Sequence, residues 1–152
     1  MTKVNLDKLQ ATSNGNIETV IATKALGNGA LVALGTPATG HREAMNAVAP
    51  TNALELLLVA APEVKYDESL DQLDITTKAN TPVRAYHLTV GDKFQSEQSL
   101  FAVTPAVGDI VTGNATNGYA VNVDSRTTFV VEALTKFGYD RRDMVLLRVL
   151  TV

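Results

Sequence analysis

The second half of the chain, from Pro82 to Val152, is a succession of short segments that are β-branched or alternate between apolar and polar residues. A Gly or an Asx residue stands between neighbouring segments, which is typical of strands joined by tight turns. The absence of a long amphipathic helix between the segments predicts a mainly β fold, either an antiparallel β-sandwich or a small β-barrel with little helix. Prolines fall at segment edges, as expected because proline cannot donate to a sheet; they are Pro37, Pro50, Pro62, Pro82 and Pro105.

The first half predicts further strands. Ile17–Thr23 and Ala30–Leu34 are apolar runs separated by Gly27-Asn28-Gly29, a pattern that predicts a hairpin because Gly and Asn tolerate the positive φ of tight turns. The segment from His41 to Ala49 is expected to be extended. The run from Ala53 to Ala61 predicts a buried strand rather than a helix, since prolines bound it closely on both sides.

The N-terminal segment, residues 1–16, is polar. It could form a short helical turn, or an extended arm that becomes ordered only against a partner, and we adopt the arm as the prediction. Its apolar residues Val4, Leu6 and Leu9 are the candidate partner-binding residues. Residues 17–152 are expected to form a single β-rich domain, and 17–81 and 82–152 are possible sub-lobes of it. A chain of 152 residues is long enough to bury one core.

Composition argues against several classes of protein. The net charge of −3 offers no basic field for nucleic acid, so no nucleic-acid partner is expected. No stretch reaches the ~18 apolar residues of a membrane helix, so no membrane partner is expected either. The chain has no cysteine, which excludes disulfides, a thiolate nucleophile and cysteine-based metal sites.

Candidate catalytic or ligand-binding residues are few. His41 and His87 are the two histidines, and neither stands in a motif that indicates catalysis. The acidic stretch from Tyr66 to Asp74 is the best candidate for binding a cation, but it lacks the glycine and the terminal glutamate of an EF-hand loop, which favours a solvated surface. Asp140-Arg141-Arg142-Asp143 is expected to be a charge-balanced hairpin tip. We expect no enzyme activity and no cofactor.

Four stretches of the sequence together resemble a known family. In this order they resemble the capsid decoration (cement) proteins of tailed bacteriophages, small structural proteins encoded beside the major capsid gene. The resemblance covers roughly Asn28 to Asp109, whereas the later strands match only in general β character. The stretches are Asn28–Gly35, Arg42-Glu43 to Val48-Ala49-Pro50, Leu57–Glu63 with Tyr66-Asp67-Glu68, and Val83–Phe94.

The resemblance implies a virion protein that is made in the host cytoplasm and binds the outside of the phage head. Its partners would be the major capsid protein, at contacts between capsid subunits, and further copies of itself in a homotrimer or another small oligomer. The family's N-terminal segments often become ordered on the capsid. Removal of Met1 to Gly15 is therefore expected to weaken capsid binding and to leave the fold intact.

Three alternatives stay open. The first is a tail or neck component, or the base of a head fibre, because β-barrels serve at all these positions. The second is a carbohydrate- or host-binding module, which would show exposed aromatic side chains along a groove. The third is a small hydrolase, which would place His41 or His87 within hydrogen-bond reach of Ser or Asp in a cleft.

Overall fold

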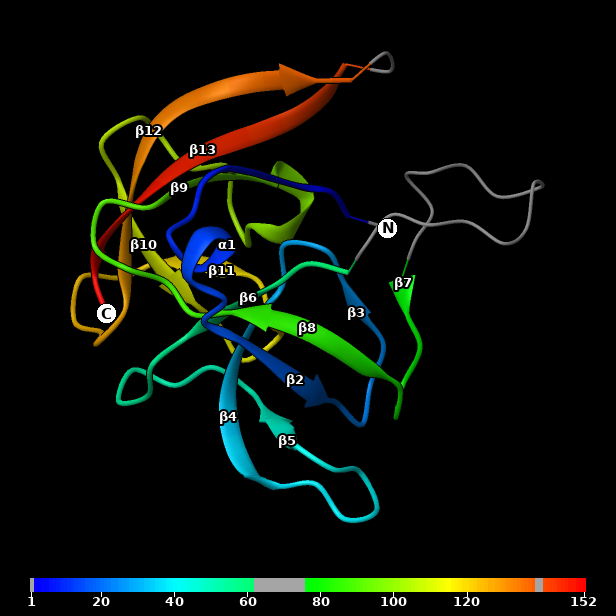
Figure 1. Ribbon diagram of the computed structural model, residues 1–152. Helices are drawn as coiled ribbons and strands as arrows, with labels where there is room; N and C mark the ends of the chain where they lie inside the picture. The colour runs from blue at the N-terminus through cyan, green and yellow to red at the C-terminus, as the bar shows by residue number, and fades with distance from the viewer. Residues whose placement is uncertain (1, 62–75, 139–140) are drawn as a thin grey trace.

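The computed structural model describes residues 2–61, 76–138 and 141–152. Strands dominate, and the predicted mainly β fold is confirmed (Figure 1). Helix is limited to α1 (Ala11–Asn14) and a 3₁₀ turn at Gln98–Leu100. In the part of the chain so described, no helix is long and apolar enough to span a membrane.

The larger sheet has six strands in the order β1-β9-β13-β12-β10-β11. β12 and β13 form a long hairpin, at the top of Figure 1, in which Lys136 pairs with Asp143 near the tip. The N-terminal strand β1 joins the edge of this sheet by pairing antiparallel with β9. The strands are β1 (Val4–Lys8), β9 (Lys93–Glu97), β10 (Ile110–Gly113), β11 (Tyr119–Val121), β12 (Thr128–Phe137) and β13 (Arg142–Thr151).

The second sheet closes on itself as a barrel in the order β2-β5-β4-β6-β8. Figure 1 shows this barrel below the six-stranded sheet, with α1 between them. A short pair, β3 with β7, lies apart from both sheets. The strands are β2 (Ile17–Ile21), β3 (Leu26–Gly27), β4 (Leu31–Pro37), β5 (Ala44–Val48), β6 (Leu57–Val59), β7 (Thr76–Thr77) and β8 (Pro82–Tyr86).

Successive side chains along the barrel strands point alternately into two separate hydrophobic cores. In β6, Leu57 and Val59 point into a core inside the barrel, whereas Leu58 between them packs in the core shared with the six-stranded sheet. β4 does the same with Val32 and its neighbour Leu31. A strand buried on both faces needs a continuous apolar run, which explains why the 53–61 stretch has no polar alternation.

The expected hairpin between Ile17–Thr23 and Ala30–Leu34 is wrong. β2 pairs with β5 and β8, and β4 pairs with β5 and β6, so these two strands are not neighbours. The Gly-Asn-Gly turn instead holds the end of β6, because the Asn28 carboxamide accepts a hydrogen bond from the Ala61 N–H (2.8 Å). The β2–β5 pair is parallel, whereas the other strand pairs among the described residues are antiparallel.

The predicted extended arm is not confirmed. β1 is part of the large sheet, and Leu9 and Ala11 belong to the shared core together with Val4. Because these side chains are almost completely buried, removal of Met1 to Gly15 would open the core and strip an edge strand. The structure therefore contradicts the expectation that this truncation leaves the fold intact.

The two sheets do not correspond to the possible sub-lobes 17–81 and 82–152. β8 begins at Pro82 and completes the barrel made by earlier strands, and β1 adds to the sheet made by later ones. The core between the sheets draws residues from both halves, such as Leu58 and Phe94.

Tyr119 joins the two sheets through its buried side chain. Its ring stacks on Phe101 with 4.6 Å between ring centroids, and its hydroxyl donates to the Gly29 carbonyl (2.8 Å) and lies 2.9 Å from the Ser96 hydroxyl. Gly29 has φ of 89°, and a Cβ there would lie 3.0 Å from Leu100. The positive φ, which side chains other than glycine rarely adopt, is the main reason that a glycine stands here.

We expect Tyr119→Phe to lower the free energy of unfolding by about 1–3 kcal/mol, because the Gly29 carbonyl and the Ser96 hydroxyl lose their buried partner. Denaturant titration measures this change. Tyr86→Phe is the matched control, since the described residues give the Tyr86 hydroxyl no hydrogen bond, and it should change stability little. Equal losses in the two variants would contradict the assigned role of the Tyr119 hydroxyl.

Candidate functional site

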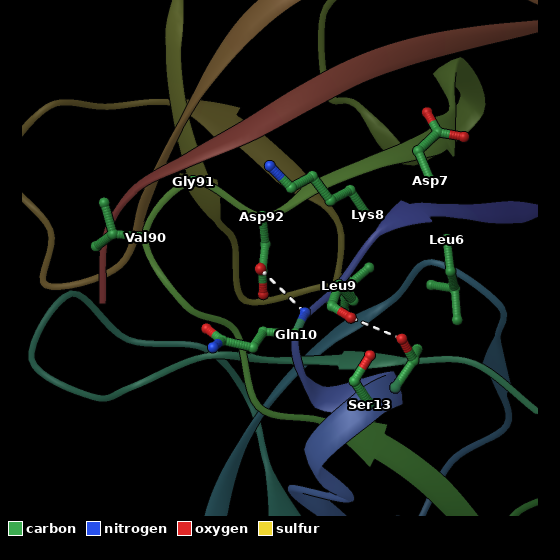
Figure 2. Close-up of a pocket in the computed structure, with 10 residues that line it drawn as sticks. Leu6, Asp7, Lys8, Leu9, Gln10, Ser13, Val90, Gly91 and Asp92 are labelled. Carbon is green, nitrogen blue, oxygen red and sulfur yellow. Dashed lines mark hydrogen bonds between the residues drawn. The ribbon is translucent and has the colours of Figure 1, made fainter.

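A pocket of about 560 Å³ lies where β1 and α1 meet the turn between β8 and β9 (Figure 2). Leu6 and Val90 give it apolar surface, and Val90 is exposed at 63%. Charged side chains stand beside them, so the pocket suits a partner with both apolar and polar groups. It is lined by Leu6, Asp7, Lys8, Leu9, Gln10, Thr12, Ser13, Val90, Gly91 and Asp92.

The Asp92 side chain holds together two of the segments that line this pocket. One carboxylate oxygen accepts from the Gln10 N–H (3.1 Å) and the other from the Thr89 N–H (2.9 Å). The Gln10 contact is drawn in Figure 2, together with the bond from the Thr12 hydroxyl to the Leu9 carbonyl. Asp92 thus ties the N-terminal segment to a turn 82 residues away in the sequence. Buried carboxylates bonded to backbone N–H groups are strong local anchors.

A second pocket, of about 320 Å³, lies between β1 and the barrel. Leu6 lines both pockets, and Arg84 stands exposed at the rim of the second one without an ionic partner among the described residues. The residues around it are Val4, Leu6, Asn28, Ala60, Ala61, Arg84 and Tyr86.

Among the residues that the structure describes, the edge of β1 away from β9 is unpaired, and it borders this second pocket. The Glu97 N–H donates to the Lys3 carbonyl (3.1 Å), and Val4 lies opposite Ser96. Because backbone groups alternate along an antiparallel strand, those of Val4 face away from β9. In the described ranges, no strand pairs with this outer side of β1.

The structure places the three candidate partner-binding residues at different depths. Val4 and Leu9 are buried in the shared core, with 7% and 5% of their surface exposed. Leu6 packs against that core but remains partly exposed at the pockets. Of the three, Leu6 is the one whose side chain a partner can reach.

His87 lies between two carboxylates. Its Nδ1 is 3.0 Å from Glu55 and its Nε2 is 3.2 Å from Glu18. Burial lowers the pKa of His87, but the hydrogen bonds and charges of Glu55 and Glu18 outweigh it, so the pKa is raised overall. This cluster was not predicted from the sequence; its one local sign is that Glu55 is a lone acid within an apolar run.

Other candidate residues are accounted for as follows. His41 is exposed in the connection between β4 and β5. Arg142 and Asp143 lie in β13, where Arg142 pairs with Glu97 (2.9 Å) and Asp143 pairs with Lys136. Asp140 and the acidic stretch from Tyr66 to Asp74 lie outside the described residues. Within the residues described, no three His or acidic side chains converge as a metal site.

The aromatic residues described are mostly interior. Tyr86 and Tyr119 are both buried, and Tyr66 and Tyr139 lie outside the described residues. Apolar exposure comes instead from valines, chiefly Val90, Val103, Val107, Val121 and Val123. Single exposed valines are ordinary on a protein surface, so Val90 is distinguished only by its place in the pocket.

Comparison of the chain with protein-family models, with curated proteins and with solved structures found no match.

We expect Asp92→Ala to lower the free energy of unfolding by about 1–3 kcal/mol, because the Gln10 and Thr89 N–H groups lose their carboxylate acceptor. Hydrogen exchange at the Gln10 amide should accelerate more than exchange in β12. Asp7→Ala is the matched control in the same pocket, since Asp7 is exposed and bonds only side chains, and it should stay within about 0.5 kcal/mol of wild type. Unchanged exchange at Gln10 in Asp92→Ala would show that Asp92 does not hold the segment.

Proposed function

We propose that the chain is a structural virion protein that binds the outside of a phage capsid at contacts between major capsid proteins and stabilises the shell. It acts without catalysis and without a cofactor, as a small homo-oligomer. Two things support the proposal: the likeness of residues between Asn28 and Asp109 to capsid decoration proteins, and the form of the β1 edge.

The β1 edge is the observation that carries the proposal. An open strand edge offers backbone N–H and C=O groups to an extended segment of a partner, which adds as a further strand. Leu6 supplies apolar surface at the same place, and the exposed Arg84 offers a positive charge to an acidic residue. An edge strand of this kind is a liability unless something covers it, which favours a binding role.

Binding of this kind stabilises a shell by mass action, because the protein binds the assembled lattice and not the free capsid subunits. A homo-oligomer that touches several capsid subunits gains further, since every contact after the first is intramolecular. A rigid scaffold keeps the ordering cost low. The Asp92 anchor and the burial of Val4 and Leu9 hold β1 rigid in this way.

Co-sedimentation with empty, expanded phage heads tests the function. Saturable binding at a fixed ratio to the major capsid protein is the expected result, and a sizing column gives the oligomeric state of the free protein. Absence from heads, with the protein found on tails or on cell-wall glycan, would overturn the proposal.

The Leu6→Ser substitution tests whether the β1 edge is the surface that contacts the capsid. We expect capsid binding to weaken about tenfold, because the partner no longer buries a leucine side chain. A point substitution is used here instead of deletion of residues 1–15, because the deletion would disrupt the core. Val103→Ser is the matched control, since Val103 is exposed at 75% and lines neither pocket beside β1, and its binding should equal that of wild type. Equal binding by Leu6→Ser would exclude this edge as the contact.

A further inference from the structure

The His87 imidazole connects three parts of the chain. His87 follows β8, Glu18 lies in β2, and Glu55 lies in the connection between β5 and β6. The His87 side chain is exposed at only 17%, and the two carboxylates are about one third exposed, at 36% and 31%. The ring therefore sits at a partly dry junction between the barrel and the Thr51–Leu56 segment.

The His87 ring must be doubly protonated to donate a hydrogen bond to both carboxylates at once. Each carboxylate can only accept, and they lie at opposite nitrogens of the ring. A neutral imidazole has one N–H and satisfies one of them, leaving a lone pair against the other carboxylate. The imidazolium donates to both. The opposite placement also prevents the three side chains from converging on one metal ion.

The Thr51–Leu56 segment is held by apolar packing, because Leu56 is fully buried in the shared core and Leu54 packs against that core, and it makes few polar contacts. The Arg126 N–H donates to the Asn52 carbonyl (2.8 Å), and the Leu56 N–H donates to the Thr127 hydroxyl (3.1 Å). Both of these partners belong to the connection between β11 and β12 rather than to the barrel. On the barrel side, the Glu55 bond to His87 is the polar side-chain contact of this segment among the described residues.

We propose that His87 is a proton-controlled latch: its doubly protonated ring ties Glu55 of the Thr51–Leu56 segment to Glu18 of the barrel, and loss of a proton loosens the segment while the barrel stays folded. The latch does not depend on the capsid proposal, since it rests on contacts within the chain.

The charged groups around the His87 ring favour its doubly protonated form. Glu18 faces it from β2 and Glu55 faces it from the segment itself. Arg126, from the β11–β12 connection, lies 3.9 Å from the far oxygen of Glu55 and balances part of that charge. Two acids facing the ring at closer range favour the imidazolium.

The sign of the pH dependence follows from the raised pKa of His87. A group whose pKa is higher in the folded than in the unfolded chain stabilises the fold fully below its unfolded pKa. That contribution is lost as the pH rises through the folded pKa. The latch is therefore closed in mildly acidic solution and opens toward alkaline pH.

Amide hydrogen exchange, corrected for intrinsic rates, tests the latch at about pH 5.5 and about pH 8.5, on either side of the histidine range. The measured quantity is the protection of the Leu56 amide relative to the Val59 amide, which bonds the Ala30 carbonyl inside the barrel (2.9 Å). We expect this ratio to fall on the order of tenfold in the wild-type protein as the pH rises.

In His87→Gln the ratio should be low at both pH values. His41→Gln, which removes the other histidine, should behave as wild type. A wild-type ratio that does not change with pH, or the same change in His87→Gln, would overturn the proposal.

A second measurement covers the case in which His87→Gln does not fold. Titration of wild-type protein by NMR should show the His87 ring and the Leu56 amide changing with one common midpoint. Glu55→Gln should lower the midpoint of the ring, because it removes one of the two carboxylates. Separate midpoints in the wild-type protein would also reject the latch.

Discussion

The buried side chain of Tyr119 is the contact on which the arrangement of the two sheets depends. Its ring fills the core between them, and its hydroxyl reaches the Gly29 carbonyl beside the barrel and Ser96 in the large sheet. Burial raises the pKa of this hydroxyl far above its usual range, so it remains a donor at any ordinary pH. The barrel and the sheet are therefore joined by directional bonds as well as by apolar packing, and their relative position is fixed.

Strand positions were largely predictable because they depend on local residues. β-branched content, Gly and Asx turns and the prolines at the edges indicated the later strands, and the apolar run before Pro62 indicated β6. Which strands pair with one another was less predictable. The Gly27–Gly29 turn predicted a local hairpin, but Asn28 holds the end of β6, and β2 lies parallel to β5. Such pairings join residues distant in sequence, and no local pattern encodes them.

The candidate site was predictable in part. Val4, Leu6 and Leu9 stood out as large apolar residues in a polar segment, and only the structure shows that two of them are core residues while Leu6 remains accessible. The His87 cluster could not be assembled from the sequence, because Glu18 and Glu55 lie 69 and 32 residues away from it. Its partners are brought together by the closure of the barrel.

The pairing of β1 with β9 has a consequence for how the chain folds. Lys3 and Glu97, which meet at this pair, are separated by 94 residues. On a ribosome, β1 is made well before its partner strand β9. Closure of so long a loop is slow, and contacts of this range delay folding. β1 therefore has to wait for β9 before it can pair, and its apolar residues stay exposed to other chains until then.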